Sequence, residues 1–356
     1  MRTLAIAGIL LGILGMGLAP HSVEFADHRL EAAIREALGI RDEALHSDDL
    51  LCLREFSAVG RDIARLDGLE FCENLAWLDL AENRISDLSP LAHLTKLETL
   101  ILRSNLVEDV SPLAGLTGLR KLDLDFNFVG DADSLRGLID LRWLGLWNSG
   151  IRDISSLSGL TELVELGLSG NPLESIEPLA GLTKLKWLGL PNTGIREIGV
   201  LSGLTNLVKL SLGGNRIVDL EPLRGLTNLE RLGLDSNEIT NVGPLAGLDK
   251  LQQLSLWGNR IVDISALRDL ILLEELWLDR NPLAEISVLA RMSHLRILGL
   301  SGTAVTDLAA LAENPGLGDG DEIDLRGLLY DPSDNWELQR AVDQLRQRGA
   351  TVLTDP

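Results

Sequence analysis

LVKLSLGGNRIVDLEPLRGLTN, residues 207–228, is one copy of a pattern that the chain repeats at a fixed period of 22 residues. When the pattern is numbered from 1 to 22, positions 1 and 17 are leucine in all twelve copies, and position 11 is always Ile, Val or Leu. Position 1 falls at Leu53, Leu75, Leu97, Leu119, Leu141, Leu163, Leu185, Leu207, Leu229, Leu251, Leu273 and Leu295. No insertion interrupts residues 53–316, so the repeats predict equal coils stacked around one continuous core.

Each copy predicts a short strand followed by a turn. Leu210 and Leu212, at positions 4 and 6, alternate as in a strand with one buried face, so positions 3, 5 and 7 point outward. We call the surface formed by these outward positions the concave face. Positions 15 and 16, as in Ser89-Pro90, have the composition of an N-cap followed by proline. They predict a short 3₁₀ turn on the opposite, convex side.

Position 9 is asparagine in eight copies and lies where the chain turns. Peptide groups that face the interior at such a turn need polar partners, and an asparagine side chain offers both a donor and an acceptor. Ser149, Thr193 and Thr303 occupy the same position and can supply only part of these bonds. The eight are Asn83, Asn105, Asn127, Asn171, Asn215, Asn237, Asn259 and Asn281.

With these residues the chain resembles the internalin-type, 22-residue class of bacterial leucine-rich-repeat proteins. The stretch FADHRLEAAIREALGI (25–40) resembles the helical N-terminal cap of that class. NPGLGDGDEIDLRG (314–327), followed by a helix near 334–348 and the strand-like ATVLTD (350–355), resembles its closing segment. The resemblance implies an α/β solenoid: a right-handed curved coil with short parallel strands on the concave face and 3₁₀ turns on the convex face. It also implies binding of other macromolecules, although the scaffold is shared by unrelated recognisers.

The chain divides into four predicted segments. Residues 1–22, with one arginine before the apolar run LAIAGILLGILGMGLA (4–19), have the pattern of a signal peptide. Residues 23–52 form the N-terminal helical cap, 53–316 the twelve repeats and 317–356 the C-terminal cap. The apolar run is short for a membrane span, so we expect a secreted or periplasmic protein with no stable membrane insertion after cleavage. The alternative is an anchor formed by an uncleaved N-terminus.

The two cysteines, Cys52 and Cys72, both lie near the start of the repeats. An even number in an exported protein favours a disulfide, whereas ideal coil spacing places the two α-carbons about 8 Å apart, just beyond disulfide reach. Cys72 stands at position 20, where later copies mostly have leucine, so it also fits a buried apolar site. The sequence therefore leaves the pairing open.

The chain is strongly acidic, with 53 Asp and Glu against 32 Lys and Arg and a formal net charge of −21. This balance disfavours nucleic acid and implies a basic protein partner or simple solubility. Much of the charge lies at position 13, where we expect solvated acids that help to start the convex turns rather than calcium ligands. These residues are Asp87, Asp109, Asp131, Asp153, Glu197, Asp219, Asp263, Glu285 and Asp307.

No motif for catalysis, metal binding or cofactor binding is present, so neither an enzyme nor a cofactor is predicted. The histidines are scattered over caps and convex positions: His21, His28, His46, His93 and His294. Asp123 and Asp125 do share the concave face and would suit acid/base chemistry. Ion pairing with Lys121 and Arg103, which would keep both carboxylates ionised, is the favoured interpretation.

Tryptophan marks the predicted binding face. Six of the seven tryptophans occupy outward positions: Trp77, Trp143 and Trp187 at position 3, Trp277 at position 5, and Trp147 and Trp257 at position 7. The leucines fill the core, so these rings are free to act as anchors for a partner. The alternative is that they pack against one another and simply cover the sheet.

Position 5 is glycine in three successive coils, Gly145, Gly167 and Gly189, which predicts a trough with a backbone floor. We expect Trp143, Trp147, Glu165 and Trp187 to form the centre of the interface, with Lys209 beside it and Trp257 and Trp277 as a second patch. In the alternative, glycine makes room for tryptophan rings that close the trough. The predicted function is recognition of a protein, or alternatively of a glycan or cell-wall polysaccharide stacked on the tryptophans.

Overall fold

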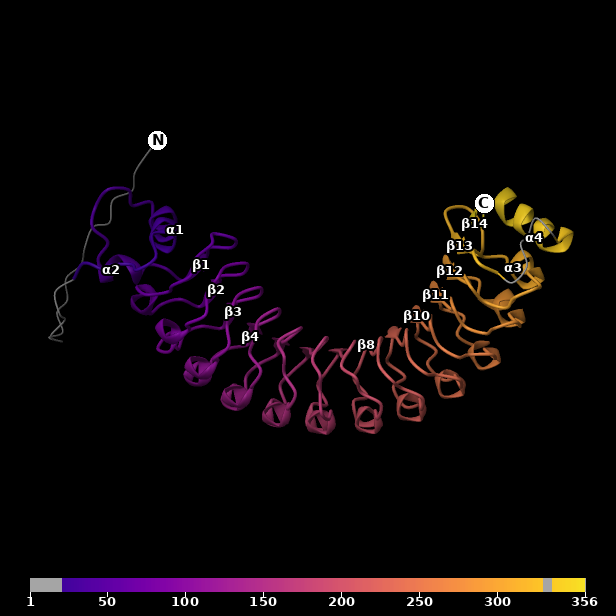
Figure 1. The fold of residues 1–356 in the computed structure, drawn as a ribbon, viewed down its shortest axis with the longest axis horizontal. Coiled ribbons are helices and arrows are strands. Elements are labelled where there is room, and N and C mark those ends of the chain that lie inside the picture. Colours follow the sequence, from indigo (N-terminus) through magenta and orange to yellow (C-terminus); the bar gives the residue numbers. More distant parts are fainter. Residues whose placement is uncertain (1–20, 329–334, 356) are drawn as a thin grey trace, which may run out of the picture.

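The computed structural model describes residues 21–328 and 335–355, so residues 1–20 of the predicted signal peptide lie outside the described part. Fourteen strands form one sheet in chain order, from β1 to β14, and all are parallel to their neighbours. The coils stack into an open arc with the strands along its inner edge and the helical turns along its outer edge (Figure 1). This confirms the predicted α/β solenoid.

The strands are three residues long and fall at the same positions of successive repeats. They are β1 (Glu55–Ser57), β2 (Trp77–Asp79), β3 (Thr99–Ile101), β4 (Lys121–Asp123), β5 (Trp143–Gly145), β6 (Glu165–Gly167), β7 (Trp187–Gly189), β8 (Lys209–Ser211), β9 (Arg231–Gly233), β10 (Gln253–Ser255), β11 (Glu275–Trp277), β12 (Ile297–Gly299), β13 (Glu322–Asp324) and β14 (Thr351–Leu353). Leu210 and Leu212 are fully buried, as the alternation predicted. From β1 to β12 each strand residue pairs with the residue one period later, as Leu210 does with Leu232, so one repeat fixes the register of the next.

The convex side carries 3₁₀ turns, as predicted. They are η1 (Leu69–Phe71), η2 (Ser89–Leu91), η3 (Ser111–Gly115), η4 (Asp133–Gly137), η5 (Ser155–Gly159), η6 (Glu177–Gly181), η7 (Gly199–Gly203), η8 (Glu221–Leu223), η9 (Gly243–Leu245), η10 (Ser265–Leu267) and η11 (Ser287–Arg291). The prediction that position 15 is the N-cap is wrong, because Ser89 is already inside η2 and its side chain caps nothing. Instead Asp87 Oδ1 accepts the Ser89 N–H at 2.8 Å, which confirms that position 13 starts the turns.

The asparagines of position 9 form the predicted ladder of buried hydrogen bonds. Asn105 Oδ1 accepts the N–H of Ile85, and its Nδ2 donates to the carbonyls of Leu80 and Leu102, all at 2.9 Å. Each such residue therefore joins its own coil to the preceding one. Ser149 donates to the Leu124 carbonyl and cannot replace the whole set. Every buried side-chain nitrogen and oxygen within the described ranges has a hydrogen-bond partner.

Helices cover both ends of the stack. At the N-terminal end α1 (His28–Leu38) is capped by Asp27, whose Oδ2 also accepts the Ala64 N–H at 2.8 Å and so ties the helix to the first coil. The short helix α2 (Ser47–Leu50) leads into the repeats. At the other end lie α3 (Ala309–Glu313) and α4 (Trp336–Gln347), and α4 buries one apolar face. None of the helices in the described residues is long and apolar enough to cross a membrane.

Both cysteines are free thiols in the structure, so the disulfide that the sequence leaves open is not formed. Cys52 is exposed, whereas Cys72 is buried in the core. Burial raises the pKa of the Cys72 thiol to about 12, so this side chain stays neutral. Cys72 thus fills an apolar position of its coil.

Candidate functional site

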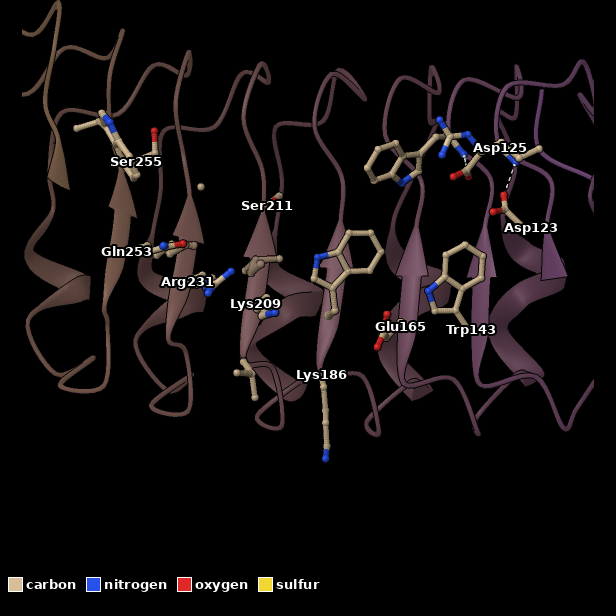
Figure 2. Close-up of a pocket in the computed structure, with 18 residues that line it drawn as sticks. Asp123, Asp125, Trp143, Glu165, Lys186, Lys209, Ser211, Arg231, Gln253 and Ser255 are labelled. Atoms are coloured by element: carbon tan, nitrogen blue, oxygen red, sulfur yellow. Dashed lines mark hydrogen bonds between the residues drawn. The ribbon is translucent and has the colours of Figure 1, made fainter. Parts of the chain in front are cut away.

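An open groove runs along the concave face between β4 and β11, with a volume of about 840 Å³. Figure 2 shows its side chains rising from neighbouring strands, with Asp123, Trp143 and Glu165 toward one end and Arg231 and Gln253 toward the other. Six of the seven residues predicted for the interface line it: Trp143, Trp147, Glu165, Trp187, Lys209 and Trp277. Trp257 does not line the groove, and Trp277 lies in the same groove rather than in a second patch.

Indole rings cover the glycines that were expected to form the floor. A Cβ atom added to Gly145 would lie 2.6 Å from Cη2 of Trp143, and one added to Gly189 would lie 3.1 Å from the same atom of Trp187. The Trp147 ring crosses to the next coil and lies over Gly167. The prediction of a trough with a backbone floor is therefore wrong, and the structure instead has the alternative arrangement, in which glycine makes room for the rings. The rings do not close the site, since the groove remains open above them.

The rings are held in place by contacts across the coils. The centroids of Trp147 and Trp187 are 6.2 Å apart with their planes tilted by 36°. Lys121 Nζ lies 4.7 Å from the Trp143 centroid, and Arg103 lies 5.7 Å from that of Phe126. Such cation–π contacts supply attraction without removing the charge from solvent. The result is a fixed aromatic surface whose indoles are each half-buried.

The same contacts explain why the predicted ion pairs are wrong. Within the described residues neither Asp123 nor Asp125 forms an ion pair with Lys121 or Arg103, because both cations face aromatic rings. The carboxylates accept backbone donors instead. Asp123 Oδ1 takes the N–H of Asp125 at 3.1 Å, and Asp125 Oδ1 takes the N–H of Trp147 at 2.7 Å.

Burial dominates the ionisation of this carboxylate pair. It raises the pKa of Asp125 to about 6, and the Trp147 N–H only partly opposes it. Burial likewise raises the pKa of Asp123. The expectation that neighbouring cations dominate the ionisation of these carboxyls is therefore wrong, because burial outweighs the charges of Arg103 and Lys121 and raises both pKa values.

Asp125→Asn should make the protein more stable at neutral pH. The folded-state pKa of about 6 exceeds the unfolded value of about 3.9, so ionisation favours the unfolded chain. Stability is thus lost as pH rises from about 4 through 6, and the variant should exceed the wild type by about 1 to 3 kcal/mol at pH 7.5 and match it near pH 4. Urea unfolding at the two pH values measures this difference.

Asp109→Asn is the control for that experiment. Asp109 is exposed and accepts the Ser111 backbone N–H, which lowers the pKa of its carboxyl. Its contribution to stability is present above the unfolded pKa and is lost on acidification, so the pH dependence has the opposite sign. Equal pH dependence in wild type and Asp125→Asn would show that the Asp125 carboxylate ionises freely in the fold.

Several lining residues were missed by sequence reasoning. Lys186, Ser211, Arg231, Gln253 and Ser255 all contribute to the groove. Arg231 follows Lys209 at position 3 of the next repeat, so the 22-residue spacing alone places two cations on adjacent strands. Ser211, Gln253 and Ser255 gave no signal, since uncharged polar residues at outward positions are equally suited to plain solvent exposure. Lys186 stands at position 2, which does not belong to the outward set.

Two exposed aromatic side chains that do not line the groove were also missed. Phe126 and Phe128 are 41% and 62% exposed. They follow Asp125 at positions 8 and 10, outside the strand, where the expected alternation gives no direction.

No group of three or more metal-ligating side chains occurs in the part of the chain that the structure describes.

Comparison with known proteins agrees with this architecture. The profile of the family described as Leucine Rich repeats (2 copies) matches residues 73–115, 95–137, 183–225 and 227–270. No curated protein sequence matches the chain. An internalin (inlF) from Listeria monocytogenes is similar in structure, with 29% identity, a TM-score of 0.86, and coverage of 93% of this chain and 96% of its own.

Two more distant structures share the fold. The functional domain of InlJ from Listeria monocytogenes is 22% identical with a TM-score of 0.63, covering 87% of this chain and 67% of its own. The ectodomain of the receptor kinase GASSHO1/SCHENGEN3 from Arabidopsis thaliana, solved in complex with CASPARIAN STRIP INTEGRITY FACTOR 2, is 18% identical with a TM-score of 0.56, covering 82% and 43%. Taken with the unbroken 22-residue period and the parallel sheet, these similarities show that the chain belongs to the bacterial internalin-type leucine-rich-repeat proteins.

Proposed function

We propose that this chain is an exported, non-enzymatic recognition module that binds a protein partner through the groove on its concave face. The observation that carries the proposal is the cluster of half-buried indoles from Trp143, Trp147 and Trp187, which opens into a groove of about 840 Å³. Curved solenoids commonly use such extended concave surfaces for binding. Aromatic side chains near the centre of an interface supply much of its binding energy.

The indoles are ordered before a partner arrives, and this favours binding. Trp147 rests against Trp187, and Lys121 lies over Trp143, so few rotamers remain to be lost on association. The strands beneath them are fixed by the repeat register. A partner would therefore meet a rigid aromatic surface about three strands wide, which corresponds to roughly 10 Å across the sheet.

Export rests on the N-terminal sequence. A basic residue followed by the apolar run 4–19 supports a signal peptide at residues 1–22, followed by a cap at 23–52, the repeats and a closing cap at 317–356. The mature protein should then lack about the first 20 to 26 residues. An N-terminus at Met1 on protein recovered outside the cytoplasm would contradict cleavage.

Trp143→Ala combined with Trp187→Ala should weaken partner binding by about 2 kcal/mol or more, which is roughly 30-fold. The mature chain serves as bait against envelope and host extracts, and the affinity of each captured protein is then measured for wild type and variants. Folding should change little, because the leucines and not these rings fill the core.

Trp336→Ala is the matched control. Trp336 is 70% exposed and belongs to α4 at the C-terminal end, away from the groove. A partner that binds wild type, Trp336→Ala and the double variant with equal affinity would place the binding site elsewhere. Competition by added oligosaccharides would instead favour the glycan alternative.

A further inference from the structure

The groove changes the sign of its charge along its length. At its β4–β6 end three carboxylates, Asp123, Asp125 and Glu165, outnumber one cation, Arg103. Toward the other end its charged residues are Lys186, which directly precedes β7, and Lys209 and Arg231 on β8 and β9. A chain with a formal net charge of −21 thus presents a cationic surface at one end of its groove.

Lys209 and Arg231 form the centre of this cationic end. They are paired residues on the neighbouring strands β8 and β9, both are exposed, and their α-carbons are separated by about one strand spacing of roughly 4.8 Å. Like charges directly opposite each other in a sheet are destabilising. Among the described residues neither side chain forms an ion pair, so the repulsion is not offset within the chain.

At four sites outside the outward strand positions, the repeat compensates a cation from the neighbouring coil. Pairs 22 residues apart are Arg120 with Glu98 at 3.2 Å, Arg152 with Glu174 at 3.4 Å, Lys184 with Glu162 at 2.6 Å, and Arg260 with Glu238 at 3.3 Å. The residues 22 positions away from the cationic pair are instead Trp187 and Gln253, which carry no charge. The next carboxylate in that row, Glu275, accepts a hydrogen bond from Gln253 Nε2 at 2.9 Å.

We infer that Lys209 and Arg231 bind a carboxylate of an acidic segment in the protein partner, beside an apolar or aromatic side chain that packs on Trp187. The inference rests on the proposed function, since it assigns chemistry to one end of the same groove. An arginine fork can bind a carboxylate through two parallel hydrogen bonds, and lysine adds a point charge. A carboxylate placed between the two cations would remove the repulsion that the chain leaves in place.

The spacing of the strands restricts the sequence of that segment. The strands β7, β8 and β9 carry Trp187, Lys209 and Arg231 at paired positions. The midpoint between the two cations therefore lies about one and a half strand spacings, or roughly 7 Å, from the strand that carries Trp187. In an extended peptide, residues i and i+2 face the same side and are about 6.6 Å apart. A segment that crosses the strands therefore matches the pattern apolar, any residue, acidic.

The inferred acidic segment differs from the basic partner that net charge predicted. Most of the negative charge at position 13 lies beside the convex turns, as Asp87 and Asp109 show by capping η2 and η3. Charges on that side face away from the groove, and salt screens exposed charges over a Debye length of about 8 Å. The groove's own cations are the charges that a bound segment would meet.

Selection of a phage-displayed library of random linear peptides on the mature chain tests the inference. The enriched peptides should carry Asp or Glu two residues from an apolar or aromatic residue. Synthetic versions should bind Lys209→Glu/Arg231→Glu at least about tenfold more weakly than wild type. Raising the ionic strength should weaken binding to the wild type.

Two further variants make the result specific. Arg216→Glu/Arg291→Glu changes the net charge equally at exposed residues outside the groove and should keep wild-type affinity. Lys209→Ala/Arg231→Ala removes the cations without adding charge and should also lose affinity. Thermal unfolding of each variant verifies that the fold is intact.

Peptides without an excess of acidic residues, no enriched peptide at all, or equal affinity for wild type and the Lys209→Glu/Arg231→Glu variant would each overturn the inference. The Trp143→Ala/Trp187→Ala variant separates this failure from failure of the proposed function. If the peptides lose affinity for the tryptophan variant but not for the cation variant, the groove is still the binding site and only the acidic segment is rejected. If the peptides bind both variants as tightly as the wild type, both the acidic segment and the proposed groove are rejected.

Discussion

Leu210→Ala should lower the free energy of unfolding by about 2 to 5 kcal/mol. Leu210 is the central residue of β8 and is 1% exposed, in a continuous core that runs through the whole stack. Its removal leaves a cavity that neighbouring coils cannot close, because their own leucines are held in register by the sheet. Urea unfolding followed by circular dichroism measures the loss.

Lys209→Ala is the control on the same strand. Its side chain points outward and is exposed, so its effect on stability should stay within about 0.5 kcal/mol. If Leu210→Ala were no more destabilising than Lys209→Ala, the inward direction of positions 4 and 6 would be wrong in every coil.

Asn237→Ala should cost about 2 to 5 kcal/mol, although it removes no apolar contact. Asn237 Oδ1 accepts the Ile217 N–H, and its Nδ2 donates to the carbonyls of Leu212 and Leu234, all at 3.0 Å. Alanine would leave these buried backbone groups without partners, and each such group costs about 1 to 3 kcal/mol. The free energy of unfolding again gives the measurement.

Two variants isolate the buried ladder as the cause. Asn228→Ala deletes the same side chain at a partly exposed site, where it donates to the Thr205 carbonyl at 3.0 Å, and should cost far less. Asn237→Ser should be intermediate, because Ser149 shows that serine at this position keeps a bond to a carbonyl. A cost for Asn237→Ala no larger than that for Asn228→Ala would contradict a structural role for the ladder.

The repeat period made most of the fold predictable. A residue at position 4 is surrounded by the same position one period before and after, so Leu210 meets Leu188 and Leu232 whatever the rest of the chain does. The same reasoning predicted the asparagine ladder and the acids that start the convex turns, since these bonds lie within one coil or join neighbouring coils. One copy of the pattern therefore contains nearly all the information about the core.

The candidate site was predictable only in part, because outward side chains are not confined by the core. The period placed Trp143, Trp147 and Trp187 on one face, but only the structure shows the Trp147 ring crossing over Gly167 to reach Trp187. Nor does sequence spacing decide whether Lys121 faces a carboxylate or the Trp143 ring. Backbone position follows from the repeat, whereas the direction of each exposed side chain is settled by competition among its neighbours on adjacent coils.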